Sequence, residues 1–256
     1  MSDDLHRTSD EVEALHYSAD GSSRAERTAV VREQAVSILI DATPQFVLLC
    51  TPEDLEALAA GAAFSQGILA SAREIRRVEV SWGDVPMIRV KLRGDRARER
   101  GYTEFKDVGE LMKAQPHVGD SLRVGPQLLT RMIKEMRSHQ VLFEATGAAH
   151  AAAVFSGDGQ MLAFSEDVAR RNAMDKVTGK CLLSGRSMAG CGVALSGRVN
   201  FELVNKAARA GIELIAAVSA PTSMAVETAQ RCGITLCAFV REGRATVYTH
   251  PHRVKS

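Results

Sequence analysis

The chain has 256 residues, of which 45% are hydrophobic and 25% charged, and these ordinary values exclude a mainly disordered, low-complexity or collagen-like protein. The 32 basic and 31 acidic residues give a net charge of +1, so no overall basic field argues for nucleic-acid binding. No apolar run approaches the ~20 residues that a membrane helix needs, and residues 1–27 lack the apolar core of a secretory signal. We therefore expect a cytoplasmic protein without a membrane or nucleic-acid partner.

The five cysteines are odd in number and scattered, which favours reduced thiols over a disulfide framework. Cys232 and Cys237 lie in apolar surroundings, where buried structural thiols are expected. Cys181 follows Lys180, whose charge would lower the pKa of an exposed thiol. Cys181 and Cys191 are therefore candidate nucleophiles, although no two cysteines form a C-x-x-C pair.

Residues 1–30 are predicted to be a mobile leader, because they are rich in Ser, Asp, Glu and Arg and poor in large apolar side chains. Ordered structure should begin near Ala35. A β-rich N-terminal subdomain with a loop is expected over residues 31–120. Its alternating apolar residues predict two hairpins, 35–41 with 45–50 and 78–81 with 87–92.

A helix is predicted between the two hairpins, with Thr51 as N-cap, Pro52 at the first helical position and Gly67 as its end. After the second hairpin, residues 89–100 carry six basic and two acidic side chains. This charge pattern is typical of a solvated edge and loop, and a docking surface for an acidic or phosphorylated partner is the alternative. Residues 101–120 have little pattern, and we expect a linker or mobile loop there.

Residues 121–256 are predicted to form an α/β core in which strands and helices alternate. The expected helices cover 122–139, 167–178, 200–210 and 222–231, and the expected strands cover 150–155, 161–164, 193–195, 213–219, 234–240 and 245–249. Repeated βα units imply right-handed crossovers and a largely parallel sheet covered by helices on both faces. The predicted fold class is therefore α/β, a layered sheet with covering helices and a smaller β-rich N-terminal part.

Small hydroxyl residues follow two of the predicted strands, where an open α/β sheet binds its ligands. Ser196 is followed by Gly197, which allows close backbone approach, and by Arg198, whose guanidinium suits an anion. Ser219 and Thr222 follow another strand. Free N–H groups and the helix dipole make each junction a candidate anion site, and plain N-capping is the structural alternative.

Two further segments place polar groups beside a predicted strand. Residues 166–176 carry pairs such as Asp167 with Arg171 at i,i+4 spacing, which favour a salt-bridged surface helix. The alternative is that these groups surround a polar ligand. His150 stands among alanines that leave room around it, and is either a core histidine bonded to backbone or a ligand-facing donor.

Zinc-deaminase chemistry can be tested in the sequence, because it needs an H-x-E motif and a P-C-x-x-C pair. The residue two after His150 is Ala152, and Cys181 and Cys191 are ten positions apart with no preceding proline. The metal ligands and the proton-transferring glutamate are both missing. We therefore expect no zinc and no deaminase activity.

Several motifs of the C-terminal half follow one another in a characteristic order. They are Thr146-Gly147 with His150-Ala151-Ala152, Glu166-Asp167-Val168, Asn172-Ala173-Met174-Asp175-Lys176, Ser196-Gly197-Arg198, Ser219-Ala220-Pro221-Thr222 and Gly243-Arg244-Ala245-Thr246-Val247-Tyr248-Thr249-His250-Pro251. Together with Gly61 and Gln66-Gly67-Ile68, this set resembles the formate dehydrogenase accessory sulfurtransferase family, FdhD. The resemblance covers residues 33–254.

The resemblance implies a cytidine-deaminase-like core without the deaminase metal, and a homodimer. It also implies a protein that takes sulfur from a cysteine desulfurase and passes it to a molybdenum bis-guanine-dinucleotide cofactor destined for formate dehydrogenase. In the family, the turn that matches residues 239–244 is assigned to binding that cofactor, for which GDP or GMP is a mimic. Arg241 and Arg244 around Gly243 suit guanylate phosphates.

The resemblance and the strand-end argument together give one set of candidate cofactor-binding residues. They are Phe239, Val240, Arg241, Glu242, Gly243, Arg244, His150, Asp167, Ser196, Arg198, Ser219 and Thr222.

Two departures from the family pattern leave the chemistry open. Family members that carry sulfur have a C-x-x-C loop, but the matching residues 101–109 contain no cysteine, and a persulfide needs a thiolate. In addition, Ala169-Arg170-Arg171 stands where the family shows Gly-Arg-His. Three hypotheses follow: a sulfurtransferase that binds the cofactor, a binding-only carrier or chaperone for it, and an enzyme that uses Cys181 or Cys191.

Overall fold

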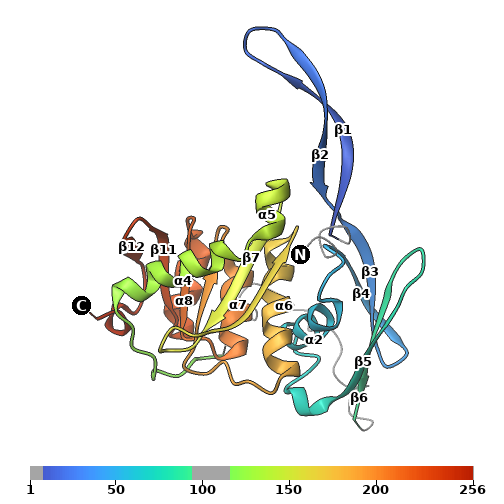
Figure 1. Cartoon of the computed structure of the whole chain (residues 1–256). Helices are drawn as coiled ribbons and strands as arrows, with labels where there is room; N and C mark the ends of the chain where they lie inside the picture. The colour runs from blue at the N-terminus through green and yellow to red at the C-terminus, as the bar shows by residue number, and fades with distance from the viewer. Residues whose placement is uncertain (1–7, 94–115, 256) are drawn as a thin grey trace.

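The computed structural model describes residues 8–93 and 116–255, and its strands form three sheets. Figure 1 shows a six-stranded sheet with helices on both faces, a four-stranded sheet beside it, and a two-stranded arm that projects from the body. An α/β fold is thereby confirmed. Within these ranges, no helix has the length and apolar character needed to cross a membrane. The basic stretch 89–100 and the expected linker 101–120 are described only in part, because residues 94–115 lie outside the described residues.

The six-stranded sheet is mixed, whereas the sequence predicted a largely parallel one. Its order is β12-β11-β10-β9-β7-β8, formed by Arg244–Val247, Thr235–Arg241, Leu214–Ala217, Gly192–Leu195, His150–Phe155 and Met161–Asp167. Only β9, β10 and β11 run parallel to one another, and the pairs β7–β8, β7–β9 and β11–β12 are antiparallel. The difference arises because β7–β8 and β11–β12 are hairpins, which join neighbouring strands by tight turns and so make them antiparallel.

Helices cover both faces of this sheet, as predicted. Alternate residues of β7 point to opposite faces, so Ala153 and Phe155 pack with Met132 of α4 (Pro126–Ser138), while Val154 packs on the other side. That other face is covered by α6 (Arg170–Leu183), α7 (Phe201–Ala210) and α8 (Ser223–Cys232). These three helices follow β8, β9 and β10 in the chain.

The four-stranded sheet has the order β4-β3-β6-β5, and its two predicted hairpins are confirmed. Its strands are Gln34–Ile40 (β3), Thr43–Cys50 (β4), Ile75–Ser81 (β5) and Met87–Leu92 (β6). The helix α2 (Leu55–Ser65) covers its inner face, and a short 3-10 turn, Ala72–Glu74, precedes β5. Whether residues 31–120 and 121–256 act as separate domains stays a prediction.

The start of α2 differs from the prediction, since its N-cap is Asp54 and not Thr51. Thr51 is buried, and its hydroxyl accepts a hydrogen bond of 3.1 Å from the Val168 N–H. Thr51 therefore ties the end of β4 to the segment after β8.

The helix α2 of the four-stranded sheet and the helix α6 of the six-stranded sheet approach each other closely at two glycines. A Cβ at Gly61 of α2 would lie 1.9 Å from the carbonyl oxygen of Asp175, and a Cβ at Gly179 of α6 would lie 1.8 Å from that of Ala57. Both contacts are with backbone atoms, which cannot rotate away. Glycine at both positions is therefore what lets α2 and α6 cross in contact.

The helix α6 is buried, whereas its charge spacing predicted a salt-bridged surface helix. Asp175 is 3% exposed and pairs with Lys206 of α7 at 2.8 Å, and Lys176 is fully buried and pairs with Asp167 at 2.7 Å. Arg171 is bound to Glu202 of α7 at 2.9 Å. The prediction from i,i+4 spacing was wrong because the charged side chains of α6 pair with residues outside this helix.

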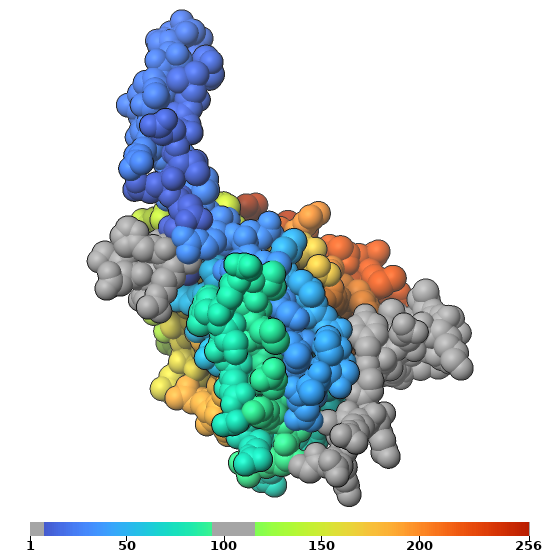
Figure 2. Space-filling model, turned by 90° about the vertical axis from the view of Figure 1, so that its right-hand side faces the viewer, coloured from blue at the N-terminus to red at the C-terminus, as the bar shows by residue number. Residues whose placement is uncertain are grey.

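The predicted leader is partly an ordered arm, so ordered structure begins well before Ala35. Strands β1 (Ser9–Tyr17) and β2 (Ser23–Val31) pair along their whole length as an antiparallel hairpin. Figures 1 and 2, seen 90° apart, both show it projecting from the body. The polar composition misled the prediction because a two-stranded ribbon exposes nearly all of its side chains, so its strands lack a buried apolar face.

Two short elements complete the fold. The helix α5 (Val141–Thr146) follows α4 and was not predicted, and the 3-10 turn Pro251–Arg253 lies near the C-terminus. Arg253 is 1% exposed, and its Nε lies 3.4 Å from the buried carboxylate of Glu213. This ion pair holds the C-terminal segment against the sheet.

Candidate functional site

Most of the predicted site residues lie along one edge of the six-stranded sheet. The carboxyl ends of the parallel strands β9, β10 and β11 meet there, and the antiparallel β7 begins there, because Ala152 of β7 pairs with Leu195 of β9. The backbone links the ends further, since Phe239 N–H donates to the carbonyl of Ser219 at 3.3 Å. The ends of these strands therefore lie along one edge of the sheet, where an open α/β sheet binds its ligands.

A cavity of about 230 Å³ opens at the β7 and β9 end of this edge. It is lined by residues of α4, α5, the following loop and the strand ends: Arg137, Gln140, Phe143, Gly147, Ala148, Ala149, His150, Ser196 and Val218. Two of the predicted residues, His150 and Ser196, thus share one cavity. No local pattern pointed to Arg137, which lies at the end of α4 and reaches the cavity only through the tertiary fold.

His150 provides a neutral imidazole in a basic environment. Burial lowers the pKa of His150, and the nearby charges of Arg170 and Arg198 lower it further, although Asp167 opposes them. Within the described ranges, Arg137, Arg170 and Arg198 have no ion-pair partner. The three guanidinium groups therefore leave a positive potential near this cavity that an anion would neutralise.

Gly197 brings the β9–α7 loop close to the imidazole. A Cβ at this position would lie 3.0 Å from Nδ1 of His150, tighter than ordinary contact. The glycine therefore lets the loop backbone lie next to the ring, while its predicted role at an anion site stays a prediction.

The hydroxyl residues of the two junctions have structural partners. Ser196 Oγ accepts from the Ala151 N–H at 2.8 Å, and Thr222 is the N-cap of α8, accepting from the Ala225 N–H at 3.2 Å. Asn200, not Ser196, caps α7. N-capping, the structural alternative, therefore describes Thr222. Ser196 directly follows β9 and lines the cavity, whereas Ser219 follows β10 and is not among the lining residues.

The arginine-bearing turn is exposed at the far part of the same edge. Phe239 has φ of 53° and is 39% exposed, and the register of β11 shifts between Ala238 and Arg241, which marks a β-bulge. Arg244 pairs with Glu242 at 2.9 Å in solvent. Three strand spacings, roughly 14 Å, separate the backbone of β11 from that of β7, so the turn and His150 lie at separate places along the edge.

Asp167 does not face the cavity, so its predicted role as a ligand group is not supported by its surroundings. Its side chain is fully buried and accepts from the N–H groups of Thr51 at 3.2 Å and Ala169 at 2.8 Å, besides pairing with Lys176. Burial raises the pKa of Asp167, and the ammonium of Lys176 opposes that rise. The residue joins the two halves of the fold.

All five thiols are buried, including the two candidate nucleophiles. Burial raises the pKa of Cys181 to about 11 and raises the pKa of Cys191. Lys180 does not activate Cys181, because its ammonium pairs with Asp54 at 2.5 Å and donates to the Phe164 carbonyl at 2.8 Å. The condition on which Lys180 was expected to lower the pKa of Cys181, an exposed thiol, is therefore not met.

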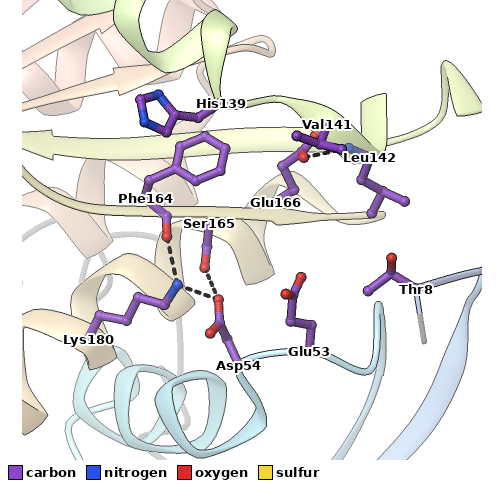
Figure 3. A pocket seen from close by; sticks show the side chains of 10 residues that line it. All are labelled: Thr8, Glu53, Asp54, His139, Val141, Leu142, Phe164, Ser165, Glu166 and Lys180. Carbon is purple, nitrogen blue, oxygen red and sulfur yellow. Dashed lines mark hydrogen bonds and ion pairs between the residues drawn. The ribbon is translucent and has the colours of Figure 1, made fainter. Parts of the chain in front are cut away.

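A second cavity of about 190 Å³ lies between α2, β8 and α5 and is shown in Figure 3. Its acidic side chains are Glu53, Asp54 and Glu166, and Lys180 and His139 also line it. Asp54 is engaged by Lys180 and by the hydroxyl of Ser165, and Glu166 by backbone N–H groups of α5. No group of His, Cys, Asp and Glu in the described part of the chain is arranged to hold a metal ion.

Comparison with known proteins gives one consistent family. The FdhD/NarQ family model matches residues 31–255. The chain is 36% identical over 247 residues to the sulfur carrier protein FdhD of Chromobacterium violaceum, covering 90% of this chain and 92% of the relative. It is 35% identical over 242 residues to the FdhD of Burkholderia mallei, covering 85% and 88%.

A solved structure extends this comparison to the fold. A Desulfotalea psychrophila protein, proposed to be a formate dehydrogenase accessory protein, superposes with a TM-score of 0.84 at 26% identity, covering 97% of this chain and 100% of that one. The family match spans the four-stranded sheet, the six-stranded sheet and the strand-end edge alike. The chain therefore belongs to the FdhD/NarQ family.

Proposed function

We propose that this protein is a formate dehydrogenase accessory protein that binds a molybdenum bis-guanine-dinucleotide cofactor as cargo, through its guanylate phosphates, at the strand-end edge. The accessory role is supported by its similarity to a sulfur carrier protein FdhD and to a formate dehydrogenase accessory protein. By the family resemblance, formate dehydrogenase is its proposed partner and a cytoplasmic homodimer its proposed state. A cysteine desulfurase is a partner only under the alternative hypothesis of a sulfurtransferase.

The binding proposal is supported chiefly by three arginines near a neutral histidine, which have no ion-pair partner among residues 8–93 and 116–255. Arg170 and Arg198 are close enough to depress the pKa of His150, and Arg137 lines the cavity that holds it. Guanidinium groups bind phosphate oxygens through paired N–H donors. A bound phosphate would relieve the repulsion among these cations, which is why the arrangement favours an anionic ligand.

The exposed turn at β11 offers a second contact along the same edge. The exposed aromatic ring of Phe239 is available for stacking on a base, and Arg241 and Arg244 stand beside it. The roughly 14 Å between β7 and β11 suits a ligand that is longer than one phosphate group. A dinucleotide cofactor meets that requirement better than a simple anion does.

Sulfur transfer by a cysteine of this chain is not part of the proposal. The five cysteines lie outside residues 94–115, and all of them are buried in the structure. Burial raises the pKa of Cys50 and Cys237 to about 12 and of Cys232 to about 11, which disfavours the thiolate that a persulfide requires. The buried thiols favour the binding-only carrier over the sulfurtransferase.

Calorimetric titration with GDP tests the binding proposal. We expect wild-type protein to bind GDP, and Arg198→Ala to weaken binding about tenfold, because one charge-assisted contact to a phosphate is worth about 1.4 kcal/mol or more. Arg170→Ala should act in the same direction. Arg244→Ala should weaken binding if the turn contacts the nucleotide.

The matched control is Arg73→Ala, which removes an exposed arginine from the 3-10 turn before β5, away from the strand-end edge. It should leave the affinity unchanged. Undetectable binding by the wild type, or equal affinity for Arg198→Ala and Arg73→Ala, would remove the proposed site.

A further inference from the structure

The helix α5 forms part of the wall of the arginine-bearing cavity but has no cap of its own. It spans only six residues, too few to be stable alone in water. Its N-cap residue is Gln140, whose side chain makes no capping hydrogen bond. The first N–H groups of a helix lack partners within the helix, so they need an acceptor from elsewhere.

Glu166 of β8 supplies that acceptor. One carboxylate oxygen accepts from the Leu142 N–H at 2.8 Å, and the other accepts from the Phe143 N–H at 2.9 Å. Figure 3 shows the carboxylate reaching toward the start of α5. Glu166 is 7% exposed, so these two charge-assisted bonds are formed largely out of water, where they are strong.

The two ends of α5 connect this carboxylate to the proposed ligand site. Phe143, whose N–H Glu166 binds, lines the cavity that also holds His150 and Ser196. The C-cap of the helix is Gly147, which has φ of 69°. The N–H of Gly147 donates to the Phe143 carbonyl at 2.7 Å. Gly147 and the next two residues line the same cavity. Fixing the start of α5 therefore fixes one wall of the cavity.

We infer that Glu166 is a positioning residue, which holds α5 in place and thereby shapes the pocket for the phosphorylated ligand. This inference rests on the proposed function. Glu166 lines the other cavity, the one shown in Figure 3, with Glu53, Asp54, His139 and Lys180 around it. It acts on the ligand through α5 and does not itself contact the ligand.

The test compares Glu166→Gln with Glu144→Gln. The first variant keeps the shape but replaces one of the two acceptor oxygens by an NH₂ group, which cannot accept from an N–H. The second removes a charge from the exposed surface of α5 and leaves its N-terminal hydrogen bonds intact. The measurements are GDP affinity by calorimetry, amide hydrogen exchange over residues 142–149, and the melting temperature.

We expect Glu166→Gln to weaken GDP binding about tenfold and to speed exchange of residues 142–149 without nucleotide. Saturating GDP should slow that exchange again, because a ligand that needs the ordered wall stabilises it. A general loss of stability would instead speed exchange in the sheet as well. Glu144→Gln should match the wild type in all three measurements.

The inference is overturned if Glu166→Gln binds GDP as well as Glu144→Gln does, or if exchange over residues 142–149 is unchanged. Failure of the wild type to bind GDP would overturn the proposed function instead. In that case the exchange comparison without nucleotide still decides whether Glu166 holds α5. The Glu166→Asp variant, whose side chain is shorter by one methylene, serves if the amide variant does not fold.

Discussion

Replacing Gly179 by alanine is expected to lower the free energy of unfolding by more than about 4 kcal/mol, which is most of the stability of the fold. In an ordinary helix the same change stabilises by up to about 1 kcal/mol, so the predicted sign is reversed. The reason is that the new Cβ would lie 1.8 Å from the Ala57 carbonyl oxygen and 2.6 Å from its carbon. The helices α2 and α6 would have to separate, and the packing between the four-stranded and six-stranded parts of the fold would be lost.

Chemical denaturation of the purified variant measures the effect. If the variant does not fold, its yield in the soluble fraction is compared with that of the wild type. Gly83→Ala is the control, because a Cβ there meets nothing within 4 Å. It should change the free energy of unfolding by less than about 1 kcal/mol. Equal stabilities for the two variants would mean that α2 and α6 do not cross in backbone contact.

The second large effect is expected for Lys206→Met, which should lower the free energy of unfolding by about 3–5 kcal/mol at neutral pH. Lys206 binds both carboxylate oxygens of Asp175, at 2.9 and 2.8 Å, and the pair is almost fully buried. Removing the ammonium leaves a buried carboxylate whose remaining side-chain partner is the hydroxyl of Ser65. The exposed pair of Arg231 and Glu227 is the control, and Arg231→Met should lower stability by less than about 1 kcal/mol.

This loss should shrink as the pH falls. Burial raises the pKa of Asp175, and removing Lys206 removes the charge that opposes the rise. Above the ordinary carboxyl pKa of about 4, the folded variant then binds a proton that the unfolded chain does not, so its stability falls as pH rises. Denaturation at pH 5 and pH 8 should give a smaller deficit at pH 5. A deficit independent of pH, or equal to that of Arg231→Met, would contradict the buried pair.

The local patterns of the sequence predicted the strands and most helices well, but not the environment of α6. Hairpin turns and apolar alternation depend on near neighbours, so both hairpins of the four-stranded sheet were found. The partners of Asp167, Asp175 and Arg171 were not, because pairing at i,i+4 considers one helix only. Two lysines buried against carboxylates from other elements leave no local signal.

The arm and α5 were missed for a related reason. The arm is exposed on most of its surface, so its sequence has the polar composition of a leader. The helix α5 is short and receives its cap from Glu166, which is 24 residues from Leu142 and 23 residues from Phe143 in the chain. Elements that depend on partners distant in sequence cannot be read from a local window.

The position of the strand-end residues, though not their role, was predicted in outline. His150, Ser196, Ser219 and the turn at β11 were expected at strand ends, and the parallel order of β9, β10 and β11 brings those ends to one edge. The contribution of Arg137 could not be foreseen, because it depends on how α4 packs across the sheet, on the face that carries Ala153 and Phe155. Their roles toward a ligand stay predictions until binding is measured.

The most direct test of the account concerns sulfur, because relatives of this chain are named sulfur carriers. The intact protein would be incubated with a cysteine desulfurase and ³⁵S-labelled cysteine, then separated without reductant and counted. We predict no stable label above that of a variant with all five cysteines replaced by serine, since every thiol is buried. Label that is released by reductant and lost on replacing one particular cysteine would contradict the account, and would make this chain a sulfur carrier in its own right.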